Sequence, residues 1–174
     1  MSNDTIAGSG LEKMFYGQIL SILVIIPLVG WIAAIVGIVL FLVGLHEAAG
    51  ADEGYRTAFY VEIGILVLSV LAVFIGVLNI VTSILSLVVI YLVCTTTAGL
   101  LEVKGDLGTA ARGRFAWKFY GGCTALGVGG SILTLIPLGN ILAMVVSGPA
   151  SIASVGGGIL LLIFLYRACK SLRY

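Results

Sequence analysis

Three long stretches of this chain contain no Asp, Glu, Lys or Arg, and they constrain the fold more than any other feature. They run from Met14 to Leu45, from Ile63 to Leu101 and from Phe119 to Tyr166. A run of about 18 or more apolar residues is a candidate to span a membrane, and the shortest of these runs has 32 residues. Charged residues make up only 10% of the chain, against about 25% in soluble globular proteins. We therefore expect an integral membrane protein without a soluble domain of useful size.

The lengths of the runs predict how often the chain crosses the membrane. A helix rises about 1.5 Å per residue and the hydrocarbon core is about 30 Å thick, so the runs of 39 and 48 residues each hold two crossings. Turn-forming residues at 76–79 and the segment SGPAS at 147–151 predict where each pair divides. The first run is either one tilted helix kinked at Pro27, or a short entry helix followed by a crossing from Trp31.

These features predict an all-α polytopic membrane helix bundle that forms one domain over residues 1–174. We expect about five transmembrane helices, or six if the first run is a broken pair. The predicted helices span about 16–45, 57–77, 79–101, 119–146 and 150–168, with polar loops at 46–56 and 102–118. The first run is about twice as long as the apolar core of a signal peptide, so we expect it to stay in the membrane.

The positions of the basic residues predict the orientation. Lys and Arg concentrate in cytoplasmic loops, and the loop at 102–118 and the C-terminal tail carry seven of the nine basic residues. Five crossings place eight of the nine on the side of the C-terminus, and a broken first run places all nine there. Both alternatives predict a cytoplasmic C-terminus in the cell membrane. The arginines of the 102–118 loop are expected to set this topology, with contact to anionic lipid as the alternative.

Two similar breaks interrupt the apolar runs. IIPLVGWI at 25–32 follows the Phe15-Tyr16-Gly17 triplet, and LIPLGNIL at 135–142 follows Phe119-Tyr120-Gly121. Inverted repeats with broken helices are typical of many secondary transporters, and with five crossings the two copies run in opposite directions. The alternative is that proline and glycine simply kink two tilted helices.

Small residues recur near helical spacing in two of the runs. Such faces let helix backbones approach closely in lipid, where no hydrophobic force acts between helices. They predict a compact bundle, a homo-oligomer or a larger membrane complex. The predicted helix-packing residues are Gly30, Ala34, Gly37, Gly121, Ala125 and Gly129.

Few residues are candidates for chemistry. Glu62 is either a proton or cation ligand or a carboxylate at headgroup depth, about 9 Å along the helix from Arg56. Carbonyl groups freed at Pro27 and Pro137, together with Asn140, complete a possible substrate or ion path. With one histidine and three widely spaced cysteines, the sequence predicts no catalytic, cofactor-binding or metal-binding residues. A net charge of +1 without a basic stripe argues against a nucleic-acid partner.

The layout resembles a known family. The opening segment GQILSILVIIPLVGWIAAIVGIVLFLVGLHEAA, and above all its Ile26-Pro27 and Val29-Gly30-Trp31-Ile32 break, resembles an uncharacterised, largely archaeal membrane family, domain of unknown function number 996. The later WKFYGGCTALGVGGSILTLIPLG resembles the second glycine-rich entry of that family. The resemblance implies a small multi-pass membrane protein and no activity, so it transfers no functional residues.

Two functions fit these observations. The first is a non-enzymatic structural or accessory subunit that packs through its Gly/Ala faces, because small residues are abundant and ionisable groups in the apolar runs are rare. The alternative is a small transporter or channel with broken helices at Pro27 and Pro137. A membrane-embedded enzyme is the third function considered, and the sequence favours it less than the other two.

Overall fold

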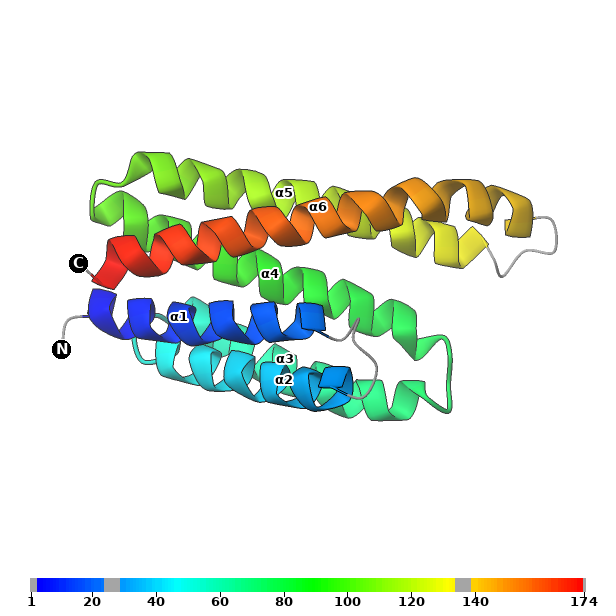
Figure 1. Ribbon diagram of the computed structural model, residues 1–174, viewed down its shortest axis with the longest axis horizontal. Coiled ribbons are helices and arrows are strands. Elements are labelled where there is room, and N and C mark those ends of the chain that lie inside the picture. The colour runs from blue at the N-terminus through cyan, green and yellow to red at the C-terminus, as the bar shows by residue number, and fades with distance from the viewer. Residues whose placement is uncertain (1–2, 24–28, 134–138, 174) are drawn as a thin grey trace.

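The chain folds into an up-and-down bundle of α-helices, seen here in a computed structural model (Figure 1). The structure describes residues 3–23, 29–133 and 139–173, and it describes their side chains except at 29, 131, 133 and 139–154. Over those residues the helices are α1 (Asn3–Ile22), α2 (Val29–Ala48), α3 (Glu53–Ala72), α4 (Leu78–Val103), α5 (Leu107–Leu133) and α6 (Gly139–Arg173).

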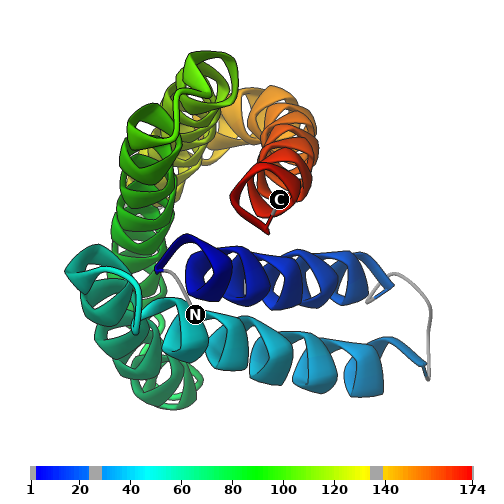
Figure 2. The same ribbon diagram turned by 90° about the vertical axis from the view of Figure 1, so that its left-hand side faces the viewer.

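Successive helices run in opposite directions and pack beside one another. α1 contacts α6 as well as α2, so the first and last helices lie side by side and both chain ends lie at the same end of the bundle (Figures 1 and 2). Viewed toward that end, the α1–α2 hairpin extends at a steep angle to the other helices (Figure 2).

The structure confirms the predicted fold class. Four segments within the described residues are long and apolar enough to cross a membrane: Gly30–Ala48, Glu53–Ala72, Leu78–Val103 and Val155–Arg173. They identify an integral membrane protein. The first charge-free run divides between α1 and α2, as the six-helix alternative predicted.

Several predicted boundaries are wrong. α6 is continuous from Gly139 to Arg173, so the chain does not divide at 147–151. A proline inside a helix is tolerated in a membrane where neighbouring groups satisfy the freed carbonyl. The predicted loops are also too long, because α2 ends at Ala48 and α3 begins at Glu53, while only 104–106 separate α4 from α5. Glu, Lys and Arg favour helices, so charge marks the end of the apolar run and not the end of the helix.

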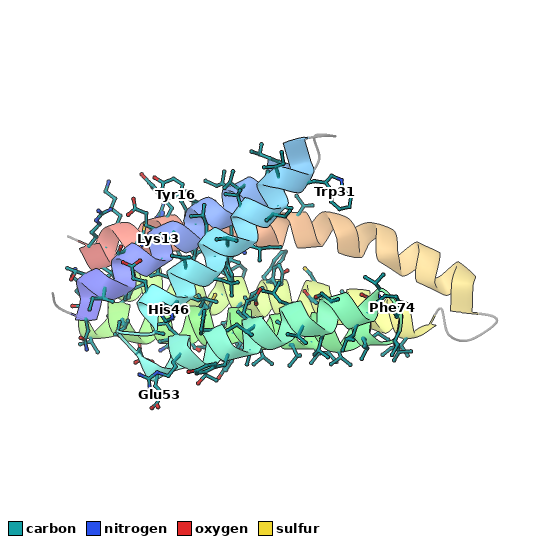
Figure 3. All side chains as sticks on the ribbon, turned by 90° about the horizontal axis from the view of Figure 1, so that it is seen from below. Lys13, Tyr16, Trp31, His46, Glu53 and Phe74 are labelled. Atoms are coloured by element: carbon teal, nitrogen blue, oxygen red, sulfur yellow. The ribbon has the colours of Figure 1, made fainter. Side chains whose placement is uncertain are left out.

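Charged residues gather at one end of the bundle. All 17 Asp, Glu, Lys and Arg residues lie within about 17 Å of the end that holds the termini, measured along their helices at about 1.5 Å per residue. At the opposite end Trp31 and Phe74 project outward with 82% and 83% of their surface exposed (Figure 3). The bundle therefore has one charged end, defined by the two termini and the 49–52 and 104–106 connections, and one uncharged end.

Glycine lets α1 and α2 come into backbone contact. A Cβ atom on Gly10 would lie 2.5 Å from the carbonyl oxygen of Gly44, and one on Gly17 would lie 2.6 Å from that of Gly37. Real Cβ atoms do not approach that closely, so no larger residue fits without separating the helices. The two glycines of each helix, Gly10 and Gly17 on α1 and Gly37 and Gly44 on α2, are seven residues apart, which keeps both contacts on one face of each helix.

A polar cluster joins the start of α5 to the end of α6. Asp106 precedes α5, and its Oδ1 accepts a hydrogen bond from the Thr109 backbone N–H at 3.0 Å, as a capping residue does. Its Oδ2 accepts a hydrogen bond from the Ser171 hydroxyl at 2.9 Å, and Lys104 donates to the Ser171 carbonyl oxygen at 2.6 Å. The backbone N–H of Thr109, then the Thr109 and Ser171 side chains, hold the pKa of Asp106 below its ordinary value of 3.8.

We expect the substitution Asp106→Ala to destabilise the protein by about 1 kcal/mol at neutral pH, the usual cost of losing a helix cap. Because folding lowers the pKa of this carboxyl, its stabilising effect is complete above the ordinary pKa and is lost as the pH falls through the lowered one. Thermal unfolding in detergent between pH 7 and pH 3 measures the difference from the wild type. Asp106→Asn keeps a capping oxygen and is the control: its stability should not show this titration. Equal stability of Asp106→Ala and the wild type at pH 7 would contradict the assignment.

Candidate functional site

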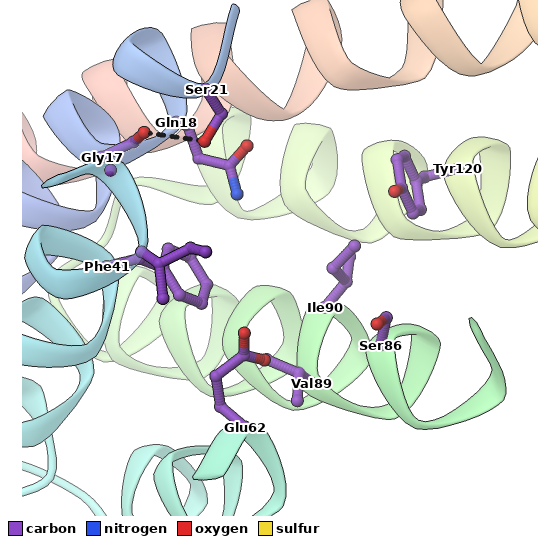
Figure 4. A pocket seen from close by; sticks show the side chains of 11 residues that line it. Gly17, Gln18, Ser21, Phe41, Glu62, Ser86, Val89, Ile90 and Tyr120 are labelled. Carbon is purple, nitrogen blue, oxygen red and sulfur yellow. Dashed lines mark hydrogen bonds between the residues drawn. The ribbon is translucent and has the colours of Figure 1, made fainter. Parts of the chain in front are cut away.

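A polar crevice lies between the α1–α2 hairpin and helices α3, α4 and α5. Its volume is about 210 Å³. Side chains from five helices converge on it (Figure 4). Its lining residues are Gly17, Gln18, Ser21, Gly37, Ile38, Phe41, Glu62, Ser86, Val89, Ile90 and Tyr120.

Glu62 is the ionisable carboxylate of this crevice. It lies near the middle of α3, nine residues after Glu53, and its half-buried side chain points into the crevice (Figure 4). It makes no hydrogen bond or ion pair with any residue that the structure describes. By contrast, three other glutamates of the charged end are paired: Glu12 with Arg173, Glu47 with Lys13 and Glu102 with Arg114. A carboxylate in an apolar segment without a partner is available to a ligand.

Polar side chains from other helices complete the lining. Gln18 comes from α1, Ser86 from α4 and Tyr120 from α5. The Ser21 hydroxyl donates to the Gly17 carbonyl oxygen at 3.1 Å, and the Ser86 hydroxyl donates to the Thr82 carbonyl oxygen at 2.9 Å. Because each hydroxyl donates its proton to a carbonyl oxygen of its own helix, the lone pairs of the hydroxyl oxygen remain free to accept from a ligand.

The glycine contact between α1 and α2 helps to form the crevice. Gly17 and Gly37 both line it, and the same two residues bring the helix backbones together. Neither contributes a side chain, so space remains beside Phe41 of α2 (Figure 4). The sequence therefore produces both the close packing and the opening with the same residues.

The lining groups favour a positively charged ligand. One carboxylate, one amide and three hydroxyl oxygens present acceptors to the crevice. Water occupies about 30 Å³ per molecule, so about 210 Å³ holds several waters and is too large for one bare ion. Within the described residues no group of three His, Cys, Asp or Glu side chains could hold a metal ion. The arrangement is suited to taking up a proton, or to binding a partly hydrated or small organic cation.

The other predicted path residues lie wholly, or with their side chains, outside the described part of the chain. Pro27 and Pro137 lie outside the described residues, and Asn140 lies in the first turn of α6 with its side chain outside them. The sequence alone did not indicate four other lining residues: Gln18, Ser21, Ser86 and Tyr120. Each is a single uncharged polar residue in an apolar helix, and only its position toward Glu62 distinguishes it.

The predicted helix-packing residues have different surroundings. Gly30 and Gly37 are buried in α2, where Gly37 meets Gly17, and Ala34 is half-buried. On α5, a Cβ atom on Gly121 would meet the Trp117 ring at 3.8 Å, Ala125 is exposed, and no described atom lies within 4 Å of a Cβ built on Gly129. The three cysteines, Cys94, Cys123 and Cys169, are free and buried.

Comparisons with known proteins add no assignment. No family model, no curated protein and no solved structure matches this chain. The resemblance to domain of unknown function number 996 therefore stays a prediction. Any function has to be argued from the geometry of the crevice.

Proposed function

We propose that this integral membrane protein is a small, non-enzymatic transporter or channel that binds a proton or a small cation at Glu62. The observation that carries the proposal is the Glu62 carboxylate, which has no partner among the described residues and points into a polar crevice among apolar helices. A charged side chain at the centre of a membrane helix costs about 2.5–3.5 kcal/mol on insertion scales, and such residues mark ion or substrate pathways.

The depth of Glu62 supports this role. α3 has 20 residues, which corresponds to about 30 Å and matches the thickness of the hydrocarbon core. Glu62 lies about 14 Å along this helix from Glu53, within the segment that is long and apolar enough to cross a membrane. Charged residues inside such segments mark substrate or ion pathways, as in many transporters.

We infer that the charged end of the bundle faces the cytoplasm. All nine basic residues belong to that end, and Lys and Arg concentrate on the cytoplasmic side of membranes. Both chain ends would then be cytoplasmic, in the cell membrane. The uncharged end, with exposed Trp31 and Phe74, would lie at the opposite interface, where tryptophan is enriched.

Flux measurements in liposomes test the proposal. Purified protein is reconstituted into potassium-loaded vesicles that contain a pH-sensitive dye, and valinomycin then sets an inside-negative potential. We expect protein-dependent acidification, or sodium uptake in the same vesicles with a sodium dye, faster than in protein-free vesicles. Proton and sodium fluxes no faster than in protein-free vesicles would contradict transport through the Glu62 crevice.

A second candidate is the structural or accessory subunit predicted from the sequence. It is favoured by the outer face of α5, where Ala125 is exposed and no described atom lies within 4 Å of a Cβ built on Gly122. Such a face suits another helix of a homo-oligomer or of a larger membrane complex. A stoichiometric partner that co-migrates after gentle extraction would favour this candidate over transport by the chain alone.

A further inference from the structure

We propose that a groove between the end of α4 and the first turns of α5 binds the headgroup of an anionic phospholipid. The groove has a volume of about 300 Å³. Its lining residues are Glu102, Leu107, Ala111, Arg114, Phe115 and Lys118. The α5 members recur every three or four residues, so they form one face of the helix, here named the α5 groove.

The α5 groove combines basic groups with exposed apolar side chains. Leu107 and Phe115 are 66% and 60% exposed although they belong to the charged end of the bundle. Phe115 stacks on Phe119 one turn further along, with ring centroids 6.2 Å apart. Phe119 begins the charge-free part of α5. The apolar surface thus continues from the groove toward the membrane-embedded part of the bundle, as lipid acyl chains require.

The charges of the α5 groove leave one positive charge in excess. A carboxylate oxygen of Glu102 lies 2.6 Å from Nη2 of Arg114, which fixes the guanidinium at the wall of the groove. A guanidinium has five N–H donors, so donors remain for a second acceptor. Lys118 lies one turn deeper and forms no ion pair with any described residue. Together the three side chains match the single negative charge of a phosphodiester.

A phospholipid is the occupant that uses every feature of the α5 groove. A free inorganic phosphate would use the basic side chains but not Leu107, Phe115 and Phe119. Each basic residue near an anionic membrane surface contributes about 1 kcal/mol, and removing one should therefore weaken binding about fivefold. The site is independent of Glu62, which lies on α3 and lines a different cavity.

Native mass spectrometry of the full-length, delipidated protein in detergent tests the site. The protein is titrated with phosphatidylglycerol and, separately, with phosphatidylcholine of the same acyl chains. We expect the wild type to prefer phosphatidylglycerol, and Lys118→Gln to weaken phosphatidylglycerol binding about fivefold without changing phosphatidylcholine binding. Arg114→Gln is a second groove variant with the same expected direction.

Arg112→Gln is the matched control, because Arg112 is an exposed arginine of the same helix that does not line the α5 groove. Its dissociation constant for phosphatidylglycerol should stay within about twofold of the wild type, since an exposed charge outside the groove acts on the lipid only through screening solvent. Equal affinity for the two lipids, or an equal loss in the Arg112 and Lys118 variants, would overturn the proposal. Displacement of phosphatidylglycerol by inorganic phosphate would also overturn it, in favour of a soluble anion.

Discussion

Replacing Glu62 with glutamine is expected to reduce the protein-dependent flux to that of protein-free vesicles. Glutamine has nearly the same shape as glutamate, but its amide carries no charge and does not take up or release a proton near neutral pH. The crevice would keep its volume while losing the carboxylate that attracts the cation. Glu62→Asp, which keeps the charge but withdraws it by one methylene group, should give an intermediate flux. Both rates are read from the dye assay with trapped pH or sodium indicator.

Glu53→Gln is the control for this prediction. It makes the same change in charge at the first residue of the same helix, outside the crevice, and should leave the flux unchanged. Unfolding of the Glu62→Gln protein must be excluded as a cause. Because an unpaired carboxylate among apolar helices is costly, this variant should melt at or above the wild-type temperature. Wild-type flux in Glu62→Gln would exclude Glu62 as the binding group.

Much of the fold could be predicted because the membrane imposes it. The charge-free runs identified the membrane and the two helices in each of the second and third runs, and the alternative of a broken first run matches α1 and α2. Four described segments are long and apolar enough to cross a membrane, so the five or six crossings stay a prediction. The division between the last two helices was wrongly predicted at 147–151. Proline and glycine occur at two places in the third charge-free run, and composition alone does not distinguish a helix kink from a helix end. The end is set by which helices pack together, which depends on the whole bundle.

The candidate site could be predicted only in part, and the reason is physical. A charged residue in an apolar helix is conspicuous, so Glu62 stood out from the sequence. Gln18, Ser86 and Tyr120 are each ordinary in a membrane helix, because a hydroxyl or amide can be satisfied by its own backbone. Their convergence on Glu62 depends on the rotation of α1, α4 and α5 about their axes. No local pattern encodes that rotation.

The close packing of α1 against α2 should be disturbed by the single methyl group that Gly44→Ala adds. We expect Gly44→Ala to destabilise the protein by about 1–3 kcal/mol, the usual cost of overpacking. A Cβ atom at this position would lie 2.5 Å from the Gly10 carbonyl oxygen and 2.8 Å from the Met14 backbone nitrogen. Backbone atoms cannot rotate away as a flexible side chain can, so α1 and α2 must separate. Thermal unfolding in detergent measures the loss.

Gly99→Ala is the matched control, because no described atom of another element lies within 4 Å of a Cβ built there. It should be neutral, or stabilising by up to about 1 kcal/mol through the higher helix propensity of alanine. Equal melting temperatures of the two variants would show that the α1–α2 contact does not require glycine. Gly44 does not line the crevice, whereas Gly17 and Gly37 do. If the α1–α2 hairpin maintains the shape of the crevice, Gly44→Ala should also lower the flux, although Gly44 is not a lining residue. Gly99→Ala should leave the flux unchanged.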